Sequence, residues 1–420
     1  MKQHVRSASA QLVGSGMKEL AALATGRDQA LFQEDLGRFS EQLRAEIEGR
    51  RILVIGGAGS IGAATVRTLV QFSPAALHVL DQNENGLAEL VRDFRSSFEA
   101  NELPDLRTLP MNFGSPVMQR FLQHEAPYDF VLNFAALKHV RSEKDAYSIL
   151  QMLDTNVVKP ARLLKWLTQR GDVRRYFCVS TDKAANPVNL MGASKRLMEH
   201  VIFSDEVLHH RNVKVSSARF ANVAFSDGSL LQGWLMRLAK GQPLATPRDT
   251  RRYFVSLEEA GQICVLAAFL APDAHLLVPR LDASRDLLLL SDLAVKVLQW
   301  FGYAPRFFDD EPAARRAAKS GEGSEYYPLL LTPLDTSGEK PYEEFVGEGE
   351  RSVEVGMKEL AGVPYVPAPP GVLTAFLEWV EVRIDSAEIP VRKEELVAAI
   401  QKVLPEFHHM ASTKSLDQRL

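Results

Sequence analysis

A short polar stretch, residues 180 to 196, holds the side chains best suited to acid–base chemistry. It reads STDKAANPVNLMGASKR, so Asp182 and Lys183 stand next to each other directly after Thr181. A second lysine, Lys195, follows near the end of the stretch. A neighbouring acid and base at the end of one strand can give and take protons on the same substrate. This segment is therefore the first candidate for a catalytic site.

A glycine-rich turn upstream predicts a dinucleotide site. The apolar run 52 to 55 leads into GGAGSIG, residues 56 to 62, and an apolar helical pattern follows over residues 63 to 72. Such a strand, turn and helix allow a tight turn, a close approach to a pyrophosphate and close packing of the helix on the sheet. The helix N-terminus then faces the phosphates. The predicted contacts are Gly56, Gly59, Ser60, Ile61 and Gly62.

Asp81 ends the next apolar strand and indicates which dinucleotide binds. A carboxylate about twenty residues past the glycines can accept hydrogen bonds from the adenosine ribose hydroxyls and would repel a 2′-phosphate. Residues 82 to 85, QNEN, contain no arginine that could offset this repulsion, so NAD is favoured over NADP. Further cofactor contacts are expected at the ends of later strands, at Asn112, Phe113, Asn133, Ala135 and Ala136.

Alternating strand and helix patterns predict an α/β fold, a Rossmann-like doubly wound parallel sheet. Strand candidates end near Met111, at Val131–Phe134 and at Phe177–Ser180, with helical stretches between them. This alternation means a parallel sheet covered on both faces. In such a sheet, ligands bind outside the carboxyl ends of the strands. The polar residues named above follow these strand ends and are therefore expected at the ligand site.

Four parts are expected along the chain. Residues 1–48 form a helical N-terminal extension, which we expect to dock on its own chain rather than to serve as a dimer or partner helix. Residues 49–225 form the NAD-binding domain and residues 226–385 a smaller α/β substrate-binding lobe. Residues 386–420 hold a C-terminal helix and tail. Residues 305–330 are rich in Glu, Ala, Lys and Gly, which indicates a surface insertion.

The composition indicates a globular protein and limits its partners. The 420 residues are 46% hydrophobic and 24% charged with a formal net charge of −4. Without a basic excess, nucleic acid is not expected as the main partner. Cys178 and Cys264 lie far apart without a CxxC pattern or a His-rich neighbourhood, so we predict neither a disulfide framework nor a metal site.

Neither a secretion signal nor a membrane span is predicted. The N-terminal residues contain no unbroken apolar segment. The most apolar window, Ile263–Ala271, is less than half of the ~20 residues that a spanning helix needs. We therefore expect a cytoplasmic protein, and we expect it to form a homo-oligomer.

The chain resembles the sugar-nucleotide 4,6-dehydratases of polysaccharide and flagellin-glycan biosynthesis, within the extended short-chain dehydrogenase/reductase superfamily. Residues 180 to 196 carry the most specific part of this resemblance, and the matching stretches together cover roughly residues 50 to 385. The other matching stretches are NFAALKHV at 133 to 140, RFANVAFSDGS at 219 to 229, TRRYF at 250 to 254 and GEKPYEEF at 338 to 345.

This resemblance implies dehydration of a nucleotide-linked N-acetylglucosamine, with UDP-GlcNAc favoured, for bacterial surface-glycan synthesis. In that reaction the sugar C4 passes a hydride to NAD, a base removes the C5 proton while an acid protonates the departing C6 hydroxyl, and the hydride returns to C6. The net redox change is zero, so the cofactor can stay bound. The resemblance assigns the acid to Asp182 and the base to Lys183. Each would need its less usual protonation state, a neutral Asp and an uncharged Lys.

Met191 departs from the pattern of the wider superfamily. Short-chain dehydrogenases usually have Tyr four residues before the lysine that matches Lys195, and its phenol takes the alcohol proton. A thioether cannot do so, and the C4 proton must leave through Thr181, Asp182, a water or a nearby Lys. Lys195 is implied to bind the nicotinamide ribose. Soluble relatives with Tyr often invert C5 and membrane-attached relatives with Met retain it, so retention is implied here.

The resemblance also places the nucleotide end of the substrate. Asn222 and Arg252 match positions that hold the diphosphate, with a structural ion pair as the alternative for Arg252. Ala221 stands where Gly is usual and residues 336–337 stand where Arg-Pro is usual, which leaves the nucleotide base open. Lys138 and His139 are expected at the mouth of the cleft, with a solvated pair as the alternative. The predicted substrate-binding residues are Lys138, His139, Asn222, Ser229 and Arg252.

Two other functions stay open at this point. A C4 or C5 epimerase on the same scaffold would use the ketone without losing water, but the Asp182–Lys183 pair argues against it. A non-catalytic sensor of NAD or of a sugar nucleotide would explain Met191. The retained Asp182, Lys183 and Lys195 argue against a sensor.

Overall fold

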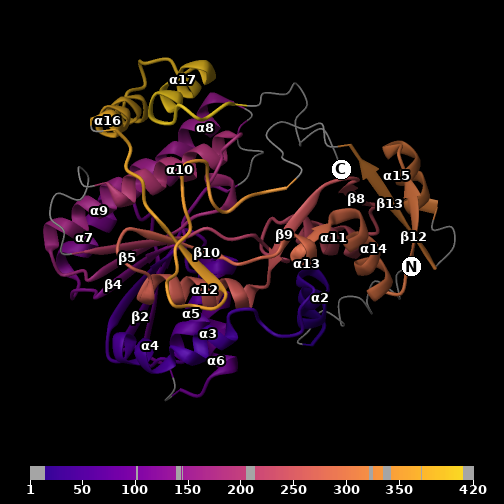
Figure 1. Cartoon of the computed structure of the whole chain (residues 1–420), viewed down its shortest axis with the longest axis horizontal. Helices are drawn as coiled ribbons and strands as arrows, with labels where there is room; N and C mark the ends of the chain where they lie inside the picture. Colours follow the sequence, from indigo (N-terminus) through magenta and orange to yellow (C-terminus); the bar gives the residue numbers. More distant parts are fainter. Residues whose placement is uncertain are drawn as a thin grey trace.

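The computed structural model describes residues 15–100, 103–138, 143, 145–204, 213–320, 325–333, 342–369 and 371–409. Its centre is an eight-stranded sheet with the order β14-β10-β6-β5-β4-β1-β2-β3 (Figure 1). All these strands run parallel except β14, which is antiparallel to β10. The strands are β1 (Arg51–Ile55), β2 (Ala76–Asp81), β3 (Asp105–Pro110), β4 (Phe130–Asn133), β5 (Arg175–Val179), β6 (Lys214–Ala218), β10 (His275–Pro279) and β14 (Leu360–Pro364).

Helices cover both faces of this sheet, as the predicted doubly wound fold requires. Residues 52–55 of β1 are all apolar because Leu53 and Ile55 enter one core while Ile52 and Val54 enter the other. The first core packs against α7 (Pro116–His124), α8 (Ala146–Leu153), α9 (Lys159–Arg170), α10 (Leu190–Phe203), α16 (Val372–Asp385) and α17 (Lys393–Val403). The second packs against α3 (Gln33–Arg38), α4 (Ser40–Ile47), α5 (Ser60–Val70), α6 (Glu84–Ser97) and α12 (Leu257–Leu270).

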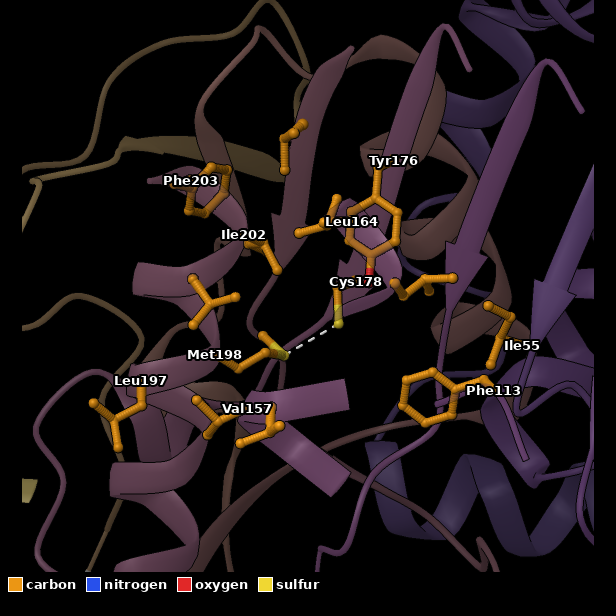
Figure 2. Packing of buried hydrophobic residues seen from close by; sticks show 14 of the residues in the cluster. Ile55, Phe113, Val157, Leu164, Tyr176, Cys178, Leu197, Met198, Ile202 and Phe203 are labelled. Carbon is orange, nitrogen blue, oxygen red and sulfur yellow. Dashed lines mark hydrogen bonds between the residues drawn. The ribbon is translucent and has the colours of Figure 1, made fainter. Parts of the chain in front are cut away.

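The first core joins strand β5 to helix α10. The predicted catalytic stretch, residues 180 to 196, begins directly after β5 and ends within α10. Tyr176 and Cys178 of β5 face Met198 and Ile202 of α10, and all four are buried (Figure 2). This packing fixes the helix against the strand end. The position of Lys195 on α10 therefore depends on an apolar contact below the site.

A smaller lobe lies to one side of the sheet (Figure 1). Its apolar core includes the buried side chains of Trp234, Leu244 and Leu329. The described helices of the lobe are α2 (Ser15–Thr25), α11 (Leu230–Ala239), α13 (Ala283–Asp286), α14 (Leu290–Trp300) and α15 (Glu311–Ser320). Its strands are β7 (Asn222–Val223), β8 (Leu244–Pro247), β9 (Arg251–Val255), β11 (Leu287–Leu289), β12 (Ala304–Phe308) and β13 (Tyr326–Thr332).

The structure departs from the predicted organisation in two places. Residues 226–385, expected to form the substrate-binding lobe, also give β10, β14 and α12 to the main sheet and its cover. The expected surface insertion at residues 305–330 is wrong, because β12, α15 and β13 form a strand–helix–strand unit. Strand β13 lies between β12 and β8 with Leu329 fully buried. The prediction failed because the composition of the whole range was considered, and the Ala-rich helix α15 outweighed the apolar strand β13 that follows it.

The N-terminal helices dock on their own chain, as predicted. Helix α2 packs in the core of the lobe, whereas α3 and α4 pack under the main sheet. Between them, Arg27 forms ion pairs with Glu259 at 2.8 Å and Asp286 at 3.2 Å. Across the described ranges, no helix is long and apolar enough to cross a membrane.

Candidate active site

A cavity of about 830 Å³ lies along the carboxyl edge of the main sheet and extends to the smaller lobe. Its walls come from the ends of β1, β2, β4 and β5 and from the start of α5 and α10. The predicted residues that line it are Gly56, Gly59, Ser60, Ile61, Gly62, Asp81, Asn112, Phe113, Ala135, Ala136, Lys138, Thr181, Asp182, Lys183, Met191, Lys195, Asn222 and Ser229.

The glycine turn between β1 and α5 has the geometry that a dinucleotide needs. Gly56 has φ +72°, and a Cβ there would lie 2.5 Å from the backbone nitrogen of Ala135. A Cβ at Gly62 would lie 2.5 Å from the carbonyl oxygen of Gly56, so α5 touches the turn. Among the described residues, an added Cβ at Gly59 would meet only that oxygen within 4 Å, at 3.5 Å. The backbone is therefore open to a ligand at Gly59.

Asp81 links the end of β2 to this turn. Its carboxylate accepts hydrogen bonds from the backbone N–H of Ala58 at 3.1 Å and of Asn83 at 2.9 Å. The side chain is half-buried and lines the cavity. A carboxylate in this position can also accept hydrogen bonds from ribose hydroxyls.

A π-helical turn supports the opposite wall of the cavity. Residues Asp154–Val158 form this turn between α8 and α9. The side chain of Asn156 bonds both the N–H and the carbonyl of Leu137, at 2.8 and 2.9 Å, and donates to the hydroxyl of Ser194 at 2.9 Å. Such turns frequently occur at functional sites. Here the turn ties the loop after β4 to helix α10.

The predicted acid–base pair, Asp182 and Lys183, lies in one tight turn after β5. Oδ1 of Asp182 accepts three hydrogen bonds, from the hydroxyl of Thr181 at 2.8 Å and from the N–H and ammonium groups of Lys183 at 2.9 and 3.1 Å. A Cβ at Gly192 would lie 2.4 Å from the carbonyl oxygen of Lys183. Only a glycine at the start of α10 lets the helix approach the turn this closely.

The second carboxylate oxygen of Asp182 differs from the first in its hydrogen bonding. Oδ2 is buried and has no hydrogen-bond partner within the described part of the chain. Its side chain is 1% exposed, while that of Lys183 is 20% exposed. A buried polar atom without a partner is costly unless a ligand or proton satisfies it. Asp182 is part of the cavity wall, and its Oδ2 is buried within that wall.

Lys195 and Met191 lie on α10, whose N-cap Asn189 accepts a hydrogen bond from Gly192 N–H at 2.7 Å. The ammonium group of Lys195 donates to the carbonyl oxygen of Val179 at 2.6 Å. Burial lowers the pKa of Lys195, and the nearby Cys178 and Glu199 oppose this effect. The lysine is thus fixed by the strand end.

Of the residues predicted to bind the substrate, some line the cavity and others do not. Lys138 is exposed at the cavity wall, and Asn222 and Ser229 are half-buried there. Arg252 is not among the described residues that line the cavity, and its Nη1 donates to the carbonyl oxygen of Arg251 at 2.8 Å. His139 lies outside the described residues, as do 336–337.

Asn133 is also away from the cavity wall. Its side chain is fully buried, donates to the hydroxyl of Tyr176 and accepts from the N–H of Ala135, both at 3.0 Å. Asn133 thus supports the site from behind, because its side chain holds the backbone of Ala135 at the cavity wall. An amide side chain at a strand end predicts a hydrogen bond, but the sequence does not show whether its partner is a ligand or the protein itself.

One contact at the glycine turn could not be predicted from the sequence. The hydroxyl of Ser60 donates to the carboxylate of Asp227 at 2.8 Å and accepts from its backbone N–H at 2.8 Å. These residues are 167 positions apart and join the start of α5 to the loop before α11. The only earlier signal is that Asp227 falls in the matching stretch 219 to 229.

These residues fit a dinucleotide. The open backbone at Gly59, the helix N-terminus at Ser60 and the carboxylate of Asp81 provide separate places for phosphates and a ribose. In the described residues no group of three or more His, Cys, Asp or Glu could hold a metal ion.

Comparison with known proteins gives relatives that include polysaccharide biosynthesis proteins, UDP-N-acetylglucosamine 4,6-dehydratases and UDP-glucose 4-epimerases. An uncharacterized membrane protein of Methanocaldococcus jannaschii is 30% identical over 72% of this chain and 81% of its own length. Capsular polysaccharide biosynthesis protein CapD of Staphylococcus aureus is 28% identical over 61% of this chain. An inverting UDP-N-acetylglucosamine 4,6-dehydratase of Campylobacter jejuni is 27% identical over 50% of it. The chain spans only 42% of CapD and 61% of that dehydratase.

Solved structures share the fold. Pen from Bacillus thuringiensis superimposes with a TM-score of 0.62 and 21% identity, over 77% of this chain and 88% of its own. DesIV is a dTDP-glucose 4,6-dehydratase from Streptomyces venezuelae solved with NAD and TYD bound. It superimposes with a TM-score of 0.52 and 20% identity, over 80% of this chain and 97% of its own. The model of the family described as "Polysaccharide biosynthesis protein" matches residues 52–363. This match spans well over half of the sequence, and the chain belongs to the polysaccharide biosynthesis protein family.

Proposed function

We propose that this protein is an NAD-dependent 4,6-dehydratase of a nucleotide-linked N-acetylglucosamine, with UDP-GlcNAc as the favoured substrate. The observation that carries this proposal is the pairing of Asp182 with Lys183 in the cavity wall, with Oδ2 of Asp182 buried and without a hydrogen-bond partner among the described residues. The dehydratase relatives named above support the substrate class. Bound NAD would supply the hydride acceptor and donor for the reacting sugar.

Asp182 and Lys183 would divide the elimination between them. Oδ2 of Asp182 can carry a proton toward a departing C6 hydroxyl, because Oδ1 already receives all three hydrogen bonds from the turn. The ammonium nitrogen of Lys183, once it has given up a proton, can remove the proton at C5. A general acid or base in this position contributes typically 10² to 10⁴ in rate.

Thr181 offers a route for the C4 hydroxyl proton in the absence of a tyrosine. Thr181 lines the cavity, and its hydroxyl donates to Oδ1 of Asp182 at 2.8 Å. A sugar hydroxyl that donates to Thr181 would thus be connected to a carboxylate through one side chain. Lys195, fixed by Val179, would hold the nicotinamide ribose, and Met191 would pack on the sugar.

Retention at C5 is the proposed stereochemical outcome, as the resemblance to relatives with Met implies. Lys183 would then return a proton to the face from which it was taken. Assignment of the first product by proton coupling constants tests this: the D-xylo 4-keto sugar supports retention, and the L-arabino product contradicts it.

The overall function is tested by incubating the protein with UDP-GlcNAc and measuring the mass of the recovered sugar nucleotide. Loss of one water supports a dehydratase. A product of unchanged mass but altered configuration supports an epimerase. Unchanged substrate, together with measurable binding, supports a sensor.

A further inference from the structure

Behind the acid–base turn lies a cluster of four buried charged side chains, Arg196, Glu199, Arg219 and Glu350. None of them is more than 9% exposed. Arg219 donates to both oxygens of Glu199, at 2.7 and 2.6 Å, and its Nη2 also reaches Glu350 at 2.9 Å. Arg196 pairs with both carboxylates. Two positive and two negative groups make the cluster neutral as a unit.

Ser180 connects this cluster to the catalytic turn. Its hydroxyl donates to Oε1 of Glu199 at 2.6 Å, and it directly precedes Thr181. On helix α10, Arg196 follows Lys195 and Glu199 lies one helical turn further on. The cluster therefore holds both the end of β5 and the helix that carries Lys195.

The segment that ends in Glu350 packs on the other side of the same turn. A Cβ at Gly347 would lie 2.3 Å from the carbonyl oxygen of Ala185, so the two backbones are in direct contact. The N–H of Glu348 donates to Asn186 at 2.8 Å. The N–H of Gly347 donates to Oε2 of Glu350 at 2.7 Å, which folds the segment back onto the cluster.

The negative charge of Glu350 is firmly held. Burial alone would raise its pKa, but hydrogen bonds and charge from Arg219, the charge of Arg196 and the N–H of Gly347 lower the pKa to about 2. Glu350 thus stays ionised wherever the protein is folded near neutral pH. Its removal would leave a buried guanidinium without full compensation.

We propose that Glu350 is a positioning residue of the active site. It acts through Arg219 and Glu199 on Ser180, and through its own segment on Ala185, so that the turn 181–183 is held between two contacts. Glu350 is not among the described residues that line the cavity. The inference rests on the proposed function for its kinetic consequence, because a small displacement of an acid or base can cost about 10²-fold in rate.

The test uses the double variant Arg196→Met/Glu350→Gln, which removes one positive and one negative charge and leaves the Arg219–Glu199 pair. We expect kcat to fall by about 10²-fold with little change in KM, because binding groups at the cavity wall stay in place. Amide hydrogen exchange in residues 180–186 should become faster, with no change in β1 and β2. Glu354→Gln, which removes an exposed carboxylate paired with Arg280, is the matched control and should leave both readouts as in the wild type.

The two readouts separate the outcomes. A lower kcat together with faster exchange in 180–186 supports the proposal. A wild-type kcat, or a lower kcat with wild-type exchange in that turn, overturns it. If the double variant does not fold, Glu350→Asp, which keeps the charge but withdraws the carboxylate by one methylene, decides by the same two criteria. If the wild type does not dehydrate a sugar nucleotide, the proposed function fails and the exchange comparison alone decides the positioning role.

Discussion

The ammonium group of Lys183 lies 3.1 Å from Oδ1 of Asp182, while Oδ2 of that carboxylate is buried without a partner among the described residues. One oxygen is thus used to fix the pair, and the other stays free to accept or donate a further hydrogen bond within the cavity wall. This division lets a single turn hold the proposed acid and base, with the hydroxyl of Thr181 as a further donor to Oδ1.

Replacing either member of the pair should reduce catalysis more than binding. We expect Asp182→Asn and Lys183→Ala each to lower turnover by about 10²-fold or more, as for a positioned acid or base. Affinity for the sugar nucleotide, measured by calorimetry, should be largely kept. Lys240→Ala removes an exposed lysine in the smaller lobe and serves as the control. Near-normal rates in both variants would show that the acid and base lie elsewhere.

Met191→Leu should keep much of the activity. Met191 is 4% exposed and lines the cavity, and a swap of similar volume usually costs less than ~1.5 kcal/mol. Initial rates at saturating substrate measure the effect. A loss of about 10³-fold, on the scale of a lost acid or base, would mean that the sulfur has a chemical role.

The purified protein should contain NAD rather than NADP. Denaturation followed by chromatography of the released nucleotides identifies the cofactor. Asp81→Ala should weaken NAD binding by roughly 10- to 100-fold, because a charged hydrogen bond to ribose is worth on the order of 1.5–3 kcal/mol. Asp93→Ala, which removes an exposed carboxylate on α6, is the control. Release of NADP alone, or no affinity for either dinucleotide, would contradict the assignment.

Acid should remove the stabilising effect of Glu350. Its pKa is depressed from 4.5 to about 2 in the folded protein, so its ionised form stabilises the fold above pH 4.5 and this contribution is lost as the pH falls toward 2. The difference in unfolding free energy between wild type and Glu350→Gln should therefore shrink on acidification, by on the order of 3 kcal/mol in total. Urea titrations at several pH values measure it. A difference that is independent of pH would show that the charge of Glu350 does not stabilise the fold.

Local patterns predicted the sheet and much of the cavity wall. The glycine turn with Asp81 and the stretch 180 to 196 each follow a strand, and parallel strands bring their carboxyl ends to one edge. The strand–helix alternation was therefore enough to gather Gly56, Asp81 and Asp182 around one cavity.

Long-range polar contacts could not be predicted in this way. Ser60 meets Asp227 over 167 positions and Arg219 meets Glu350 over 131. The spacing of apolar residues along the chain does not predict such pairs, because their side chains come together only in the folded sheet and lobe. Asn133, predicted at a strand end as a cofactor contact, bonds Tyr176 and Ala135 instead. Arg252, placed by the resemblance, is not among the described residues that line the cavity.

The most direct test of the account is the mass of the product formed from UDP-GlcNAc in deuterated water. Elimination across C5 and C6 by Lys183 and Asp182 predicts a sugar nucleotide that has lost one water and gained one deuterium at C5, from wild type and not from Lys183→Ala. Recovery of the substrate at its original mass, or loss of water without deuterium at C5, would contradict the proposed reaction at this site.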